Sequence, residues 1–441
     1  MRADNKIAFN RRRLLRASGL IPLTALAAPA LSACGDAGSS GGHLTAWGVV
    51  SFTKEGDRLL GEQMQEWGDA NGFTVEYSPV PGSNYPAKLG TAVEAGSLPD
   101  VVMLEDTQPI YYGGQGHLAD ITDLFTELKS QGGGMFDTLS PYVAVPAGTY
   151  AVPMESNLTV MYARLDLIEK VTGQRTPPAT LDELEEIARA AQTPPDTYGI
   201  GLPLGKSVDG NTVLSLIYAD GGTLVDEQGN PAVDNDGTVS ALTRIQRWWQ
   251  DKLIPPDAPS SDDAWNNQVF QSKRAAFVFN APSIYGWLQE NDPDLLANTA
   301  QAPLPAGKAG SVQSANCWSW GVSATSANLN PAKDLIRYLM APDRVEQVYE
   351  KVAGRWYPVY RDLTTSPYWQ EREAFRTFPE IIDNARTNWY PATASAELLT
   401  KLTSVGDTFV PLQMAVDVTL QGMSPEQAAK RGQEQMEQLF A

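Results

Sequence analysis

The sequence predicts an α/β fold in which strands and helices alternate to form an open, largely parallel sheet. Strand and helix patterns follow one another in the order β-α-β-α-β over residues 44–104. The chain has 441 residues, which suggests two domains at about 100–200 residues per domain. Hydrophobic residues make up 42% of it and aromatic residues 9%, so the chain can bury a core and wholesale disorder is excluded.

The first elements can be followed in order along the chain. Residues 44–50 are a β-rich run, and apolar residues at positions 60, 64 and 67 then repeat at helical spacing until Asn71-Gly72 stops the helix. Alternation over 73–77 indicates a second strand, and 85–96 a short helix. The apolar run 100–104 is typical of a buried parallel strand. Ligands of such sheets bind beyond the carboxyl ends of the strands, so we expect a site there.

Helix starts are marked further along the chain. Thr180-Leu-Asp-Glu183 is a capping box that opens a helix to about residue 192. Pro331 and Ser424-Pro425-Glu-Gln427 mark two more helix starts. Residues 220–233 are rich in Gly and Asp and predict a hairpin. Residues 234–237 faintly resemble a calcium loop, but the terminal ligand positions lack acidic residues, which favours a turn.

The first 33 residues predict an export signal. A basic segment with the twin arginines Arg11-Arg12 precedes an apolar run over 17–31, which is too short to span a bilayer as a helix. Leu31-Ser-Ala-Cys34-Gly35 resembles a bacterial lipobox, so we expect Cys34 to become the lipidated N-terminus of an extracytoplasmic lipoprotein on the cell membrane. An ordinary signal peptide with a coincidental cysteine is the alternative, and the export route stays open. Residues 34–42 are a flexible tether.

The charge of the chain excludes two classes of partner. The formal net charge is −19, and removal of residues 1–33 leaves 27 basic and 51 acidic residues, a charge of −24. A nucleic-acid binder needs a basic face, and so does a protein that docks electrostatically on anionic lipid. We therefore expect neither activity.

Several kinds of catalytic chemistry are also absent from the sequence. The only histidines are His43 and His117, and no nucleophile elbow, phosphate loop or dinucleotide-binding motif occurs. Cys317 is the only cysteine after Cys34, so no disulfide forms within the globular part. We predict no catalytic residue, metal site or cofactor. A secreted glycosidase that uses two carboxylates stays open as an alternative.

A series of loose motifs in a specific order carries a family resemblance. From about Leu44 to Phe440 the chain resembles the extracellular solute-binding proteins of carbohydrate importers, the family of the maltose-binding protein. Departures at Ala163, Lys273 and Phe277 stand where the family usually has Asn, Gly and Met. The segments that resemble the family are 98–103 (LPDVVM), 116–123 (GHLADITD), 150–156 (YAVPMES), 160–164 (VMYAR), 178–184 (PATLDEL), 270–277 (FQSKRAAF) and 302–305 (APLP).

The resemblance implies a two-lobed periplasmic-binding-protein-like fold of type II that closes on its ligand like a hinged trap. It places residues 43–153 and 281–317 in the N-terminal lobe, and 154–280 and 318–441 in the C-terminal lobe. It also implies a monomeric, non-enzymatic component of an ABC transporter, which passes a sugar to permease subunits with a separate ATPase. The same fold with a polyamine, metal, polyol or glycerol phosphodiester as ligand is a further alternative.

Candidate ligand residues follow from what a sugar presents, which is apolar C–H faces and a belt of hydroxyl groups. A site for it needs aromatic platforms and charged or amide side chains. In the first lobe, Trp47 closes a strand and Ser51 begins the loop after it, while Tyr85 opens a helix. Glu105 and Asp106 follow the buried strand 100–104.

The crossing segments supply further candidates. Glu155 lies in the first crossing, where the resemblance implies an acidic sugar ligand; a hinge carboxylate satisfied by backbone N–H groups is the alternative. Asn280 follows the strand 275–279, and Trp318 lies in the third crossing. Trp265 begins a helix.

Arg355 and Trp356 belong to the segment Gly354–Pro358, which corresponds to a family loop that borders the ligand. For the tryptophans, core packing is the competing interpretation. Trp318 and Trp320 share one strand face, so at least one of them is expected to pack in the core.

Overall fold

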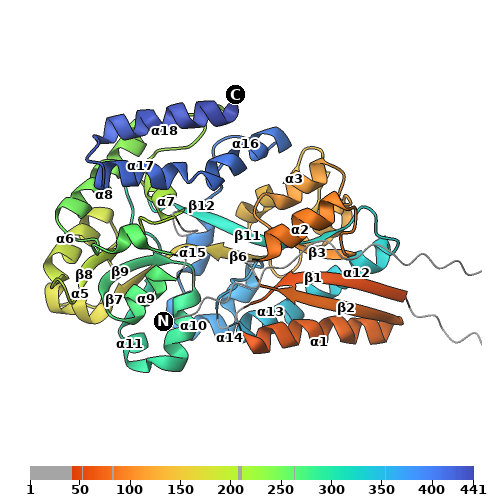
Figure 1. Cartoon of the computed structure of the whole chain (residues 1–441). Helices are drawn as coiled ribbons and strands as arrows, with labels where there is room; N and C mark the ends of the chain where they lie inside the picture. Colours follow the sequence, from red (N-terminus) through yellow and green to blue (C-terminus); the bar gives the residue numbers. More distant parts are fainter. Residues whose placement is uncertain (1–41, 52, 82–83, 207–210, 263, 353) are drawn as a thin grey trace, which may run out of the picture. The chain divides into compact units, whose positions relative to one another are not determined.

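The computed structural model describes residues 42–441 apart from 52, 82–83, 207–210, 263 and 353 (Figure 1). Cys34 and the expected signal and tether lie outside these residues, except for Gly42. Two sheets carry the fold, one of six strands in the order β12-β11-β3-β1-β2 with β6 beside β11, and one of four strands in the order β10-β7-β9-β8. Among the described helices, none combines the length and the apolarity that crossing a membrane requires.

The strands of the first sheet are β1 (Gly42–Val49), β2 (Phe73–Val80), β3 (Val101–Glu105), β6 (Ala151–Leu158), β11 (Gln313–Val322) and β12 (Ala385–Arg386). Those of the second sheet are β7 (Val160–Arg164), β8 (Tyr198–Gly201), β9 (Ala275–Asn280) and β10 (Thr299–Ala302), and a small ribbon pairs β4 (Ala144–Val145) with β5 (Gly148–Thr149).

The helices up to residue 300 are α1 (Lys54–Asn71), α2 (Tyr85–Glu94), α3 (Gln108–Gly114), α4 (Thr122–Lys129), α5 (Leu165–Thr172), α6 (Leu181–Ala191), α7 (Asn211–Ala219), α8 (Asp236–Gln250), α9 (Trp265–Gln271), α10 (Ser283–Asn291) and α11 (Pro293–Ala297). The later helices are α12 (Leu329–Leu339), α13 (Pro342–Lys351), α14 (Pro367–Gln370), α15 (Phe378–Asp383), α16 (Ala396–Asp407), α17 (Val410–Thr419) and α18 (Pro425–Phe440).

The first sheet begins as the alternating pattern predicts. β1 pairs in parallel with β2 and with β3, and β3 is buried up to its last residue. Helix α1 packs against β2, with α12 and α13 against α1 (Figure 1). Its N-cap is Thr53, whose hydroxyl accepts a bond from the backbone of Gly56, and it ends at Gly72, which takes the left-handed conformation that glycine tolerates best.

The local signals for helix caps and for one turn region are confirmed by the structure. Capping boxes open α6 at Thr180 and α18 at Ser424, as the sequence predicts. The hairpin expected over 220–233 is present in a short form: Val225 and Pro231 make an antiparallel bridge, and the Ala232 N–H donates to the Leu224 carbonyl at 2.8 Å. At 234–237, where a turn was favoured over a calcium loop, Asn235 caps the start of α8 through Thr238.

The strand pairing differs from the expected lobe boundaries in two places. β10 lies within the segment expected in the N-terminal lobe, yet it pairs with β7 in the second sheet. Residues 318–322 of β11 were expected in the C-terminal lobe, yet they pair with β3 in the first sheet. Motifs mark strands but do not show which partner a strand finds, because the partner is set by contacts far apart in sequence.

A buried ion cluster ties α6 to α8. The carboxylate of Glu185 accepts two bonds from Arg247 at 2.5 and 2.6 Å, one from Arg189 at 2.9 Å, and one from the indole of Trp248 at 3.1 Å. Burial opposes ionisation of Glu185, but the bonds from Arg247 and Arg189 outweigh it and lower its pKa to about 2. A buried carboxylate of this kind is stable only because its partners are in place.

Glu185→Gln is therefore expected to remove pH-dependent stability. Because the folded pKa lies below the ordinary value of 4.5, the contribution of Glu185 is present above about pH 4.5 and is lost as pH falls toward 2. We expect the variant to lose about 2–3 kcal/mol of unfolding free energy at pH 7 and to show a shallower decline between pH 5 and 3 in urea titrations. Glu186→Gln, at the exposed neighbouring position, is the control and should follow the wild type.

Candidate functional site

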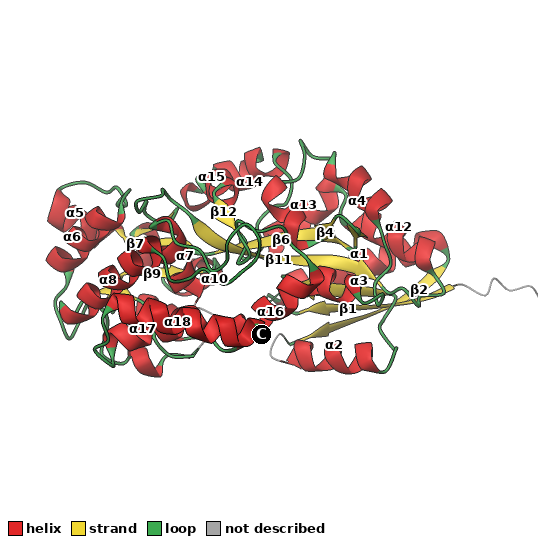
Figure 2. Ribbon diagram, turned by 90° about the horizontal axis from the view of Figure 1, so that it is seen from above, coloured by secondary structure: helices red, strands yellow, loops and turns green. Residues whose placement is uncertain are grey.

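Three predicted residues form one row across the first sheet. Trp318 of β11 is paired with Glu105 of β3 on one side and with Glu155 of β6 on the other. Side chains that are directly opposite in antiparallel strands lie on the same face. Figure 2 shows β11 and β6 side by side along this sheet. We name Glu105, Trp318 and Glu155 the Trp318 row, in which an indole lies between two carboxyl groups.

A β-bulge lies next to Glu155, at the β6 end of the row. The register between β6 and β11 shifts just after Trp318, since Glu155 pairs with Trp318 and Pro153 with Ser319. The extra residue is Met154, whose carbonyl accepts a bond from the hydroxyl of Tyr349 at 2.6 Å. Bulges re-aim the side chains beside them and are common next to binding sites.

Two polar residues lie next to Glu105, at the β3 end of the row. Asp106 follows β3 with a φ of 48°, and its backbone N–H donates to the carbonyl of Cys317 at 2.9 Å. The amide of Asn316 donates to Glu105 Oε1 at 3.0 Å. Sequence reasoning did not select Asn316, although it precedes Trp318 by two residues in the same crossing strand and alternation would have placed it on the same face.

Burial alters the ionisation of the carboxyl groups. Glu155 is completely buried; its Oε1 accepts a bond from the backbone of Trp318 at 3.1 Å, and its Oε2 has no hydrogen-bond partner among the described residues. Burial raises the pKa of Glu155 to about 8, with the Trp318 N–H and Arg355 acting in the opposite direction. Burial also raises the pKa of Asp106 to about 7, and nearby Glu105 adds to that rise. Near pH 7, Glu155 is therefore mostly protonated and Asp106 is partly protonated.

Burial and a hydrogen bond act in opposite directions on the pKa of Glu105 as well. Burial raises its pKa, and the hydrogen bond from Asn316 lowers it. A carboxyl group that keeps its proton donates one hydrogen bond and still accepts others. The row can thus offer both donors and acceptors to a polar ligand.

Tyr85 and Trp47 lie on the elements beside the row. The ring of Tyr85 meets that of Trp318 edge to face at 5.9 Å, and its buried hydroxyl donates to the carbonyl of Met103 at 2.6 Å. Tyr85 therefore supports the indole of Trp318. Trp47 lies within β1 rather than at its end, and the ammonium group of Lys88 is 3.6 Å from the centroid of its ring.

The predicted loop 354–358 joins β6 next to the row. Ser156 and Tyr357 form a bridge, with the Ser156 N–H donating to the Tyr357 carbonyl at 3.2 Å. This bridge brings Arg355 close to Glu155: burial lowers the pKa of Arg355, and Glu155 raises it. Trp356 is buried in the core cluster. At Gly354, with a φ of 76°, an added Cβ would lie 2.3 Å from the ring of Phe375.

The structure does not bring three of the predicted residues into this group, and their ligand role stays a prediction. Ser51 is buried and its hydroxyl donates to the carbonyl of Thr53 at 3.0 Å, so it shapes the turn before α1. The Trp265 indole donates to Asp257 at 3.1 Å. The side chain of Asn280 is engaged with Asn267 and with the backbone of Ala281.

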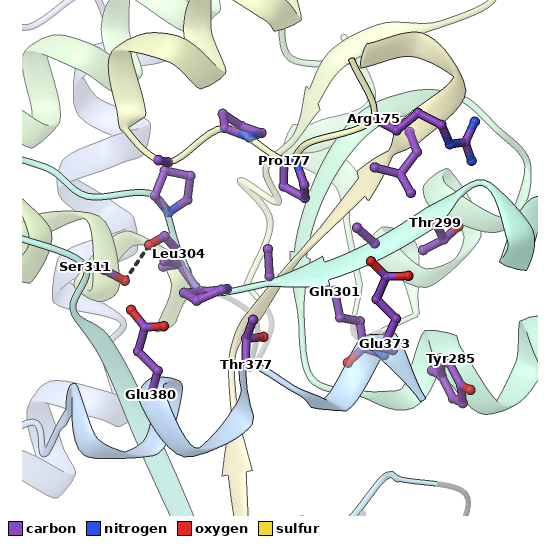
Figure 3. Close-up of a pocket in the computed structure, with 18 of the residues that line it drawn as sticks. Arg175, Pro177, Tyr285, Thr299, Gln301, Leu304, Ser311, Glu373, Thr377 and Glu380 are labelled. Atoms are coloured by element: carbon purple, nitrogen blue, oxygen red, sulfur yellow. Dashed lines mark hydrogen bonds between the residues drawn. The ribbon is translucent and has the colours of Figure 1, made fainter. Parts of the chain in front are cut away.

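A separate hollow of about 520 Å³ runs along β10 (Figure 3). Its walls come from β10 and the loop after it, from residues 175–179 and from residues 373–380. Figure 3 shows the carboxyl groups of Glu373 and Glu380 directed toward β10 and that loop, where Ser311 donates to the Leu304 carbonyl at 2.6 Å. None of the residues predicted to bind a ligand lines this hollow.

No metal centre is present among the residues that the structure describes, since no three His, Cys, Asp or Glu side chains there are grouped to hold an ion. The described residues do bring together one indole, several carboxyl groups, an amide and a guanidinium group.

Comparison with known proteins identifies the family. The profile described as bacterial extracellular solute-binding protein matches residues 62–377, well over half of the chain. The chain belongs to this family. A probable ABC transporter-binding protein of Deinococcus radiodurans is 27% identical over 370 residues, which cover 78% of this chain and 81% of that protein. The maltodextrin-binding protein MdxE of Bacillus subtilis is 28% identical over 220 residues, 48% of each chain.

Solved structures confirm the fold of this solute-binding protein. The sugar-binding protein MalE of Xanthomonas citri matches it with a TM-score of 0.76 at 19% identity, covering 90% of this chain and 97% of that one. The GacH receptor of Streptomyces glaucescens matches with a TM-score of 0.74 at 21% identity, covering 91% and 98%. The predicted two-lobed α/β fold of type II and the predicted family resemblance are both confirmed.

The raised pKa of Glu155 predicts a stability effect opposite to that of Glu185. Because the folded pKa of about 8 lies above the ordinary 4.5, protonation of Glu155 stabilises the fold below about pH 4.5, and this stabilisation is lost as pH rises through 8. Glu155→Gln keeps the neutral form, so its unfolding free energy relative to wild type should rise by about 2–4 kcal/mol between pH 5 and 9 in urea titrations.

The exposed Glu227→Gln variant is the control, and its difference from wild type should be the same at both pH values. An equal difference at pH 5 and 9 for Glu155→Gln would show that this carboxyl group is ionised in the folded protein.

Proposed function

We propose that this protein is the carbohydrate-capturing component of an ABC importer. The Trp318 row carries the proposal, because an indole between two carboxyl groups presents the two features that a sugar recognises, an apolar ring face and hydrogen-bonding groups at its edge. Family membership supports the solute-binding role, and several relatives and solved neighbours are named for sugars or sugar polymers.

Capture proceeds by closure of the two lobes on the ligand, which then passes to permease subunits powered by a separate ATPase. Ligand contacts that exist in full only in the closed form shift the population toward it. The protein acts as a monomer without turnover. It works outside the cytoplasm, held at the membrane by lipid on Cys34, and residues 35–42 give the folded part reach.

The decisive test is whether Trp318 carries sugar affinity. A thermal-shift screen of mono- and oligosaccharides should find one that stabilises the wild type by about 2.7 kcal/mol at a hundredfold excess over Kd. Trp318→Ala is expected to weaken that ligand by about 2–4 kcal/mol in calorimetry, because a central aromatic anchor is lost. Trp249→Ala, which removes a partly buried indole from α8, is the matched control and should leave Kd unchanged.

Two results would contradict the proposal. If no saccharide stabilised the protein, the sugar assignment would be wrong. If oligosaccharides were hydrolysed and Glu155→Gln or Glu105→Gln abolished product release, the protein would be a glycosidase that uses these carboxyl groups as acid and base.

The anchor is tested separately through Cys34. In the bacterium, an alkynyl fatty acid is expected to label the wild type, which should fractionate with membranes. Cys34→Ser should lose the label and be released from the membrane, because a serine hydroxyl does not replace the acceptor thiol. Cys317→Ser, at the buried second cysteine, is the control and should keep the label. Label that persists in Cys34→Ser would place the lipid elsewhere.

A further inference from the structure

Acidic groups exceed basic ones at the Trp318 row. Glu105, Asp106 and Glu155 supply three carboxyl groups, and among the described residues Arg355 is the only cation found to act on Glu155. Among the described residues, Tyr142, Tyr349 and Cys317 also interact with Asp106 or Glu155, and burial keeps these three groups neutral by raising each pKa. The ammonium group of Lys88 lies over the ring of Trp47.

Glu155 also has a hydrogen-bonding position that no described residue fills. Its side chain is completely buried, and one oxygen accepts the backbone N–H of Trp318 at 3.1 Å. The other oxygen has no hydrogen-bond partner among the described residues. A buried carboxyl oxygen without a partner costs free energy, so it is an open position for a donor.

The indole between the carboxyl groups limits which hydrogen-bond donor of a ligand fits the row. Neighbouring strands are about 4.8 Å apart, so the backbones at Glu105 and Glu155 are separated by about 10 Å, with Trp318 between them. An aromatic face attracts an organic ammonium group, and flanking carboxyl groups bind the same group by charge-assisted hydrogen bonds. A neutral hydroxyl group forms weaker hydrogen bonds with the carboxyl groups and has no positive charge for the aromatic face to attract.

We propose that the Trp318 row selects a saccharide bearing a protonated amine over its neutral counterpart. The ammonium group lies over the Trp318 ring, donates to the open oxygen of Glu155 and supplies the positive charge that the row lacks. This inference rests on the proposed function of carbohydrate capture and specifies its ligand class.

Proton balance gives the inference a distinctive signature. In the ligand-free protein, the excess negative charge is reduced by protons on the carboxyl groups. An ammonium group brought beside them favours their ionised forms, so the proton leaves for the buffer as the amine binds. A neutral sugar brings no charge and releases no proton in this way.

The experiment compares matched ligands on the exported protein, purified in detergent. The ligands are glucosamine, N-acetylglucosamine and glucose, each also as its α-1,4- and β-1,4-linked disaccharide. Calorimetry at pH 6.5, in two buffers of different ionisation enthalpy, measures Kd and proton release together. We expect the amine of at least one series to bind ten times more tightly than its acetylated and neutral counterparts, and to be the only member that releases protons.

Variants locate the effect at the row. Glu155→Gln should reduce the preference for the amine to less than threefold and abolish the proton release. Glu105→Gln is a second, partly exposed probe and should reduce the preference as well. Glu94→Gln, at an exposed position of α2, is the matched control and should change neither quantity.

The outcomes separate this inference from the proposed function. Equal or tighter binding of the neutral or acetylated sugars overturns the inference and leaves carbohydrate capture standing. Binding of no saccharide, neutral or amine-bearing, overturns both. A simple polyamine such as spermidine, titrated in parallel, overturns both if it binds while every saccharide fails.

Discussion

Strand β11, held between β3 and β6, is the constraint on which the rest of the site depends. It is antiparallel to both neighbours, so each residue from 318 to 321 has a defined partner on either side. At Trp318 those partners are Glu105 and Glu155. The bulge at Met154, fixed by the Tyr349 hydroxyl of α13, sets the point where the register changes. Loop 354–358 joins the same edge through Ser156 and Tyr357, which brings Arg355 to the carboxyl group of Glu155.

Two buried glutamates of this protein show how environment decides ionisation. Glu185 is surrounded by guanidinium groups and an indole N–H, so it stays ionised and joins α6 to α8. Glu155 receives one backbone N–H and has an open oxygen, so burial prevails and it keeps its proton near neutral pH. The first arrangement is complete without a ligand. The second costs stability in the free protein, which is the usual condition of a group whose partner arrives from outside.

Local chemistry accounts for the elements that were predicted correctly. The cap at Thr180, the stop at Gly72 and the alternation in β2 each depend on residues a few positions apart, so they can be recognised in the printed sequence. The lobe positions of β10 and of residues 318–322 depend on distant partners. Those partners are chosen by packing across the whole domain, which a linear motif does not encode.

The sequence by itself determined the order of the first strands and helices, the family, and the presence of Glu105, Glu155 and Trp318 in strand ends and crossings. Only the tertiary structure decided that these three share one row, that Asn316 and Arg355 join them, and that Trp320 and Trp356 belong to the core. Helix caps and periodicity depend on neighbouring residues. The Trp318 row and the ionisation of its carboxyl groups arise from burial and from pairing between segments more than two hundred residues apart, and these exist only once the chain has folded.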